Sequence, residues 1–225
     1  MRFYTAAMTF EDPVAAAGRW VDAAAAGDPV ALGELGAALG GLTQRADQGD
    51  PIAQRTLGFV LQHGVGTASD RGRAAELYRA AAASGDPWAA YNLGVLAGRS
   101  AESIPWLRLA AEGGLVPAFP ALGDRLSDHD LDEEALQWYV KGAEAGDKGS
   151  MFAAACWYRD GFGGPVDLVQ ALRWYLAMLD IGSGDGIHEA HQIAPAMSDD
   201  QIRAAGRLAG RITDAEIFLT QRAET

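Results

Sequence analysis

The feature that most constrains the fold is a recurring Gly-Asp pair, followed by proline in three of the four copies that mark unit boundaries. The copies are Gly27-Asp28-Pro29, Gly49-Asp50-Pro51, Gly85-Asp86-Pro87 and Gly146-Asp147-Lys148. Gly113-Gly114 with Pro117 resembles a degenerate copy between the last two. The equivalent glycines stand at 49, 85, 114, 146 and 182, so the units are 36, 29, 32 and 36 residues long. Periods of this length predict a repeat protein.

The last unit repeats the first without a gap. A shift of 97 positions aligns Leu61 with Tyr158, Gly64 with Gly161, Gly66 with Gly163, Asp70 with Asp167, Ala74 with Ala171, Tyr78 with Tyr175 and Gly85 with Gly182. The two shorter units are explained by loss of the inter-helix loop, which is 63–66 in the first unit and 161–164 in the last.

Each unit is interpreted as two helices. In Gly-Asp-Pro, a left-handed glycine ends one helix, aspartate caps the next, and proline fits its first position because the missing N–H needs no partner there. We expect first helices at about 51–62, 87–98, 117–127 and 148–159, and second helices at about 70–84, 103–113, 131–145 and 167–181. Abundant alanine and few β-branched residues favour an all-α chain of about ten to twelve helices.

The two helices of a unit carry complementary side chains. The first has a small residue followed by Leu-Gly, as in Ala53 with Leu57-Gly58, and the second has an aromatic pair or a variant of it, as in Trp138-Tyr139. Large residues on one helix then fit against small ones on the other.

This combined pattern resembles the Sel1-like repeat, a relative of the tetratricopeptide repeat. The resemblance covers 49–182 as four repeats within a single repeat domain, 1–225, with a capping or degenerate unit at 9–48 and a degenerate unit with a capping helix at 183–225. It implies a right-handed α-solenoid of stacked antiparallel helix pairs that scaffolds bacterial protein complexes by holding a partner in its concave face. Some relatives have a cysteine pair in each repeat and a link to β-lactam binding, which does not carry over to a chain with Cys156 alone.

The ends of the chain are expected to cap the array, because stacked repeats leave an apolar face at each terminus. A helix entered through Thr9 and Pro13 would cover the first face. Near the other end, Ser198 to Gln201 forms a capping box, and a second box from Thr213 to Glu216 predicts the start of a final helix.

The charge balance narrows the classes of partner. The chain has 30 acidic and 18 basic side chains, a net charge of −12, and no Lys/Arg cluster. Nucleic acid and anionic membranes are therefore not expected as partners. One cysteine excludes an internal disulfide, and neither a leader nor a long apolar run stands out, so we expect a soluble cytoplasmic protein.

Candidate chemistry is sparse. His188 and His191 lack a third ligand, the glycine-rich loops lack the lysine of a phosphate loop, and the acidic run 128–134 lacks the glycine and spacing of a calcium loop. Cys156 has no nearby histidine in the sequence. We expect no enzyme activity, no metal and no cofactor.

One stripe of residues lies opposite the packing side of the first helices, where an amphipathic surface helix would be polar. The predicted partner-binding residues on it are Arg55, Phe59, Trp88, Tyr91, Val95, Phe152 and Arg159. Two interpretations stay open: an aromatic groove that binds a partner, or side chains that adjacent repeats bury in each other.

The sequence thus favours a non-catalytic scaffold or adaptor that holds a peptide or helix of another protein. The alternative is an immunity- or inhibitor-type protein whose acidic surface neutralises a basic toxin or enzyme. An enzyme such as a hydrolase is the least favoured class.

Overall fold

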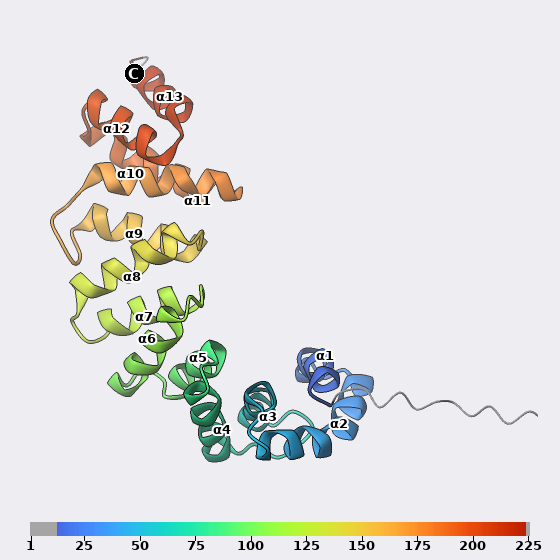
Figure 1. Cartoon of the computed structure of the whole chain (residues 1–225). Coiled ribbons are helices and arrows are strands. Elements are labelled where there is room, and N and C mark those ends of the chain that lie inside the picture. Colours follow the sequence, from blue (N-terminus) through green and yellow to red (C-terminus); the bar gives the residue numbers. More distant parts are fainter. Residues whose placement is uncertain (1–12, 224–225) are drawn as a thin grey trace, which may run out of the picture. The chain divides into compact units, whose positions relative to one another are not determined.

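The computed structural model describes residues 13–223, and every regular element in that part of the chain is helical (Figure 1). This confirms the all-α expectation. The chain divides into two compact units, Met1–Gly98 and Arg99–Thr225, and each is described by itself. No described helix is long and apolar enough to cross a membrane.

The described part of the first unit, from Pro13 on, contains five helices. They are α1 (Pro13–Ala25), α2 (Pro29–Asp47), α3 (Pro51–His63), α4 (Arg71–Ala83) and α5 (Pro87–Leu96). Each packs on the next along the chain. Its core holds Leu35 and Leu42 of α2 together with Leu57 and Val60 of α3 and the loop residue Val65, all buried.

The second unit contains eight α-helices and three short 3-10 helices within the described residues. The α-helices are α6 (Ile104–Glu112), α7 (Ala118–Ser127), α8 (Asp132–Glu144), α9 (Lys148–Asp160), α10 (Leu168–Ala177), α11 (Asp185–Ile193), α12 (Asp199–Ala209) and α13 (Ile212–Ala223). The 3-10 helices are Ala101–Ser103, Met178–Ile181 and Ala194–Ala196. Successive helices pack on each other from α6 to α11, and α12 packs on α10 and on α13.

The Gly-Asp junctions have the predicted geometry. Gly27, Gly49, Gly85 and Gly146 have φ values between 85° and 89°, a region that favours glycine. The aspartate that follows each of them accepts backbone N–H bonds at the start of the next helix, and Asp50, for example, accepts from Ile52 and Ala53. These bonds, with Arg45, hold the pKa of Asp50 below its ordinary value.

The gapless alignment between the first and last repeats holds at atomic detail. The Val65 N–H donates to the Val60 carbonyl at 3.0 Å, and the N–H of Phe162 donates to the Trp157 carbonyl at 3.0 Å. The Asp70 N–H bonds Leu61 at 2.9 Å, as that of Asp167 bonds Tyr158 at 2.8 Å. The two loops therefore have one backbone design.

Glycine and tyrosine meet where the two helices of a repeat cross. A Cβ built on Gly58 would lie 2.7 Å from a ring carbon of Tyr78, and one on Gly123 would lie 2.6 Å from a ring carbon of Tyr139. Both tyrosines are buried. At Gly58 and Gly123, therefore, only a hydrogen atom fits beneath the ring as it stands.

Some boundaries differ from the prediction. There are thirteen described α-helices instead of ten to twelve, because the terminal segments form more helices than were counted. The helix expected at 87–98 ends at Leu96, since Gly98 takes a φ of 71°, and the pair expected at 87–113 is divided between the two units. The capping box at Ser198 is present, but α13 begins at Ile212, so Thr213 lies inside the helix and does not cap it. Thr9 lies outside the described residues.

Candidate partner-binding surface

Five of the seven predicted binding residues lie on α3 and α5 of the first unit. Trp88 is 43% exposed and Val95 is 48% exposed, while Tyr91 between them is half-buried. The rings of Trp88 and Tyr91 meet edge to face with centroids 5.9 Å apart. Meanwhile Ala89, Ala90, Leu93 and Gly94 form the buried side of α5. Apart from Leu93, the helix therefore buries small residues, and the large apolar side chains that it leaves exposed are Trp88 and Val95.

The helix α3 also leaves apolar side chains at its surface, although it buries Leu57 and Val60. Phe59 is half-buried and rests on His63 at 4.4 Å between ring centroids, and the neighbouring Ile52 is 52% exposed. The Arg55 guanidinium lies 3.6 Å from the carboxylate of Asp86, the residue that caps α5. This ion pair joins α3 to the start of α5. We call Ile52, Phe59, Trp88, Tyr91 and Val95, with Arg55, the α3–α5 stripe.

Phe152 and Arg159 both lie on α9 of the second unit. Phe152 is 36% exposed, and its ring meets that of Tyr175 at 6.0 Å. It lines an apolar cavity of about 390 Å³ beside Met178, at whose edge Lys148 pairs with Asp185 at 2.7 Å.

Arg159 is the centre of a polar network. Its guanidinium bonds Glu189 of α11 at 2.6 Å and Asp160 at 2.7 Å, and it lies 3.4 Å from the Tyr175 hydroxyl. The Cys156 sulfur lies 3.4 Å from the same hydroxyl. Burial, followed by the contact with Cys156, raises the pKa of Tyr175 above its ordinary value. Arg159 therefore links α9 to α11, a contact that no sequence pattern predicted.

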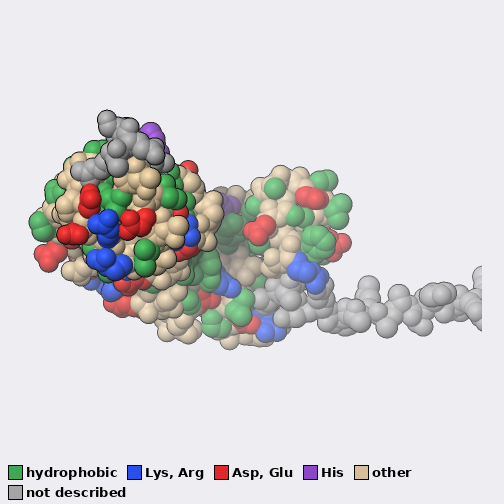
Figure 2. All heavy atoms as spheres, turned by 90° about the horizontal axis from the view of Figure 1, so that it is seen from above, with side chains coloured by type: hydrophobic (Ala, Val, Ile, Leu, Met, Phe, Trp, Pro, Cys, Tyr) green, Lys and Arg blue, Asp and Glu red, His purple; other side chains and the backbone are tan. Residues whose placement is uncertain are grey.

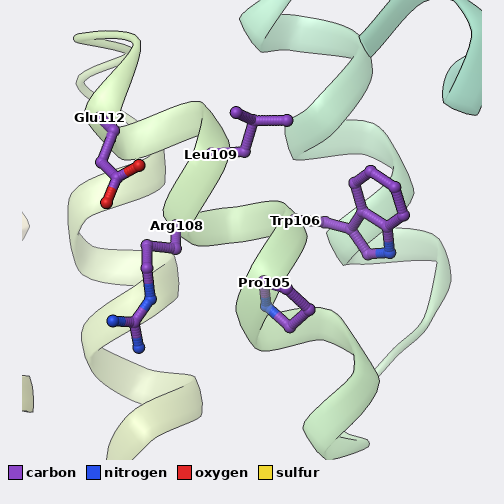
Figure 3. Close-up of a pocket in the computed structure, with 5 residues that line it drawn as sticks. All are labelled: Pro105, Trp106, Arg108, Leu109 and Glu112. Carbon is purple, nitrogen blue, oxygen red and sulfur yellow. The ribbon is translucent and has the colours of Figure 1, made fainter. Parts of the chain in front are cut away.

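Sequence reasoning missed an apolar surface on α6. Pro105, Trp106 and Leu109 line a cavity of about 370 Å³, and Leu109 is 44% exposed. Trp106 and Leu109 project from one side of α6, and Arg108 and Glu112 project from the other (Figure 3). The aromatic pattern had assigned Trp106 to the packing of its repeat, as holds for the buried Trp138 and Trp174. Position in the repeat alone could not reveal its partial exposure.

The histidines considered above as metal ligands make ordinary contacts within the fold. Among the described residues, no group of three or more His, Cys, Asp or Glu side chains could hold a metal ion. The Nε2 atom of His188 lies 2.9 Å from the Gln192 amide nitrogen, and the His191 ring packs on Phe218. On the face drawn in Figure 2, basic side chains lie beside acidic ones and form no extended basic surface.

Short helices joined by equivalent caps and loops, each packed on its neighbour, define an α-helical repeat protein of the tetratricopeptide type. The Sel1 repeat pattern matches residues 51–86, 125–147 and 149–183. The chain is a Sel1-like repeat protein. Its resemblance to this family, inferred above from the Leu-Gly and Trp-Tyr patterns, is thereby confirmed.

Solved structures show the same fold. A Sel1 repeat protein from Oxalobacter formigenes is 22% identical, with a TM-score of 0.67, over 86% of this chain and 84% of that one. A protective antigen of uropathogenic Escherichia coli with this fold is 21% identical, with a TM-score of 0.55; the match covers 95% of this chain and 59% of the antigen. An immunity protein from Pseudomonas aeruginosa, at 17% identity and a TM-score of 0.42 over 91% of this chain and 81% of that one, is too distant to carry an argument. Curated protein sequences give no significant match.

Proteins built from Sel1-like repeats are typically protein-binding scaffolds and are generally non-catalytic. The class of function expected from the sequence is thus supported at this level.

Proposed function

We propose that the protein is a non-catalytic scaffold or adaptor that binds a peptide or helix of another protein on the α3–α5 stripe. The observation that carries this proposal is the inverted division of α5, in which alanine and glycine are buried while Trp88 and Val95 are exposed. Folding gains little from an exposed indole, whereas aromatic side chains are the commonest anchors of protein interfaces.

The stripe also has the spacing that suits an extended or helical partner. Trp88, Tyr91 and Val95 stand at i, i+3 and i+7 along α5, and Ile52 and Phe59 stand seven residues apart on α3. Residues at these spacings share one helix face. The Arg55–Asp86 pair provides charged groups beside the apolar side chains, where they can orient a partner through hydrogen bonds.

The test is site-specific photocrosslinking in the source organism. A photoreactive phenylalanine placed at 88 should form a covalent adduct with one protein, and the same residue placed at 30, which replaces the exposed Val30 of α2, should not. With that partner purified, Trp88→Ala and Tyr91→Ala should each cost about 2 kcal/mol or more of binding, which is about 30-fold in Kd.

A matched pair of valines separates binding from folding. Val95→Ala should weaken binding, and Val30→Ala, at a valine outside the stripe that is more exposed than Val95, should not. A Trp88→Ala variant whose melting temperature falls as far as that of a core variant such as Leu93→Ala would mean that the stripe is core and the proposal is wrong.

The same experiment addresses the alternative function. A small basic toxin or enzyme as the crosslinked protein, inhibited on binding, would replace the scaffold by an immunity- or inhibitor-type role, and the net charge of −12 suits such a partner. The cytoplasmic location expected from the sequence stays a prediction, which fractionation of the source cells would check.

A further inference from the structure

A second candidate surface lies wholly in the second unit, at the carboxyl ends of α7 and α9. It is a cavity of about 460 Å³ with Tyr139 and Trp157 on its wall and Arg99, Asp124, Arg125 and Asp128 around it. We call it the Trp157 cavity. None of the seven binding residues predicted from the sequence lines it.

Trp157, and Phe162 beside it, are larger than the fold requires at their positions. The gapless repeat alignment places Trp157 at the position of Val60 and Phe162 at that of Val65, and the loop hydrogen bond between the two positions is the same in both repeats. Both valines are buried in the first unit. Trp157 is only half-buried, and Phe162 is 52% exposed. A valine pair therefore suffices for this loop, and the last repeat carries two rings at the surface instead.

The rings form a continuous aromatic wall. The Trp157 ring meets that of Tyr139 at 5.0 Å and that of Phe162 at 5.7 Å. Tyr139 is buried, so the wall runs from the core, through the half-buried indole, to an exposed phenyl ring. Aromatic faces of this kind attract apolar side chains and cations.

The charges around the cavity indicate whether it suits an apolar side chain or a cation. Both guanidiniums are committed to one carboxylate, because Arg99 and Arg125 each lie 2.6 Å from Asp128. Asp124 accepts the Tyr139 hydroxyl at 2.6 Å and forms no ion pair with any described residue. Other carboxylates near this end of α7 and α8 that form no ion pair within the described part of the chain are Asp130, Asp132 and Glu133.

Burial and the nearby carboxylates both affect the pKa of Tyr139. Its pKa is raised above the ordinary value first by burial, then by its bond to Asp124 and by the charges of Asp124, Asp128 and Asp132. A cation placed against the indole would therefore meet both a ring face and Asp124, a carboxylate that forms no ion pair with a described residue.

We propose that the Trp157 cavity binds the side chain of an arginine or lysine presented by a protein partner. The aliphatic stem packs on Trp157 and Phe162, and the charged group lies beside Asp124. This inference rests on the protein-binding function proposed above but uses a different unit of the chain, and it assigns the partner a basic residue.

The experiment uses three blocked tripeptides that differ only at the middle residue: arginine, the uncharged norleucine, or glutamate. The nitrogen-15 spectrum of the tryptophan indoles is followed during titration, and Trp157→Phe identifies the Trp157 signal among the six tryptophans. The arginine peptide should shift that signal saturably at millimolar concentration, as suits a single side chain, and the other two should not.

The decisive variant is Asp124→Asn. Asparagine keeps a carbonyl that accepts the Tyr139 hydroxyl, so the fold is retained while the charge is lost. The affinity for the arginine peptide should fall about tenfold, and Glu112→Gln, which removes an exposed carboxylate from α6, should leave it unchanged.

An equal response to norleucine, unchanged affinity in Asp124→Asn, or no shift with any peptide would overturn the proposal. A response to glutamate alone would also overturn it and would assign the cavity to anions through Arg99 and Arg125. None of these results bears on crosslinking at position 88, so a failure of the cavity and a failure of the α3–α5 stripe can be told apart.

Discussion

Replacing Gly58 by alanine tests the close approach of α3 to the Tyr78 ring of α4. The added methyl group would lie 2.7 Å and 2.9 Å from two ring carbons of Tyr78, whereas ordinary carbon contacts are about 3.5–4.0 Å. The Tyr78 ring is fully buried and its hydroxyl donates to Gln62 at 3.0 Å, so it cannot withdraw without losing packing or that bond.

The magnitude follows from two opposed effects. Overpacking of this kind costs about 1–3 kcal/mol, and alanine in a helix regains about 0.5–1 kcal/mol over glycine. We therefore expect a net loss of about 1–2 kcal/mol in the free energy of unfolding. The last repeat carries Ala155 at this position beside a buried Tyr175, so the ring has a way to adjust and the variant should still fold.

Gly36→Ala in α2 is the matched control. Nothing lies within 4 Å of a Cβ built on Gly36, so alanine there should stabilise by about 0.5–1 kcal/mol. In a unit of this size, 1 kcal/mol corresponds to a shift of about 4–8 °C in Tm. Urea and thermal unfolding followed by circular dichroism at 222 nm should move in opposite directions for the two variants. If Gly58→Ala and Gly36→Ala stabilise the protein equally, the Tyr78 ring does not lie close against Gly58.

Two further predictions concern the second unit and pH. Removing the Arg159–Glu189 pair by Glu189→Gln should lower stability by about 1 kcal/mol, because a half-buried guanidinium loses one of its two carboxylate partners and keeps only Asp160. An unchanged urea midpoint would contradict its role in joining α11 to α9. The raised pKa values of Tyr78, Tyr139 and Tyr175 mean that the folded chain favours the neutral phenols, so their contribution is fully present below pH 10 and is lost as the pH rises above it. The ionisation of at least three of the six tyrosines, followed at 295 nm, should therefore coincide with loss of helicity. Ionisation of all six before unfolding would show these hydroxyls to be accessible.

The local design of this protein could be predicted from its sequence. Which glycines take positive φ, which aspartates cap helices and where the two equivalent loops lie all depend on residues within a few positions of one another. The Leu-Gly pattern likewise predicted a close approach of two helices, and Gly58 and Gly123 confirm it. The large exposed side chains of the α3–α5 stripe were found by helical periodicity alone.

The tertiary structure decided which aromatic side chains are exposed and which residues Arg159 pairs with. Trp138 and Trp174 are buried while Trp106, at the same position of its repeat, is not, because the covering side chains come from other helices. Arg159 pairs with Glu189, thirty residues along the chain, and Trp157 and Phe162 stand at the surface where the matching valines are buried. A repeat pattern fixes backbone geometry through short-range sterics and hydrogen bonds, but the surroundings of a side chain depend on which distant helices pack beside it.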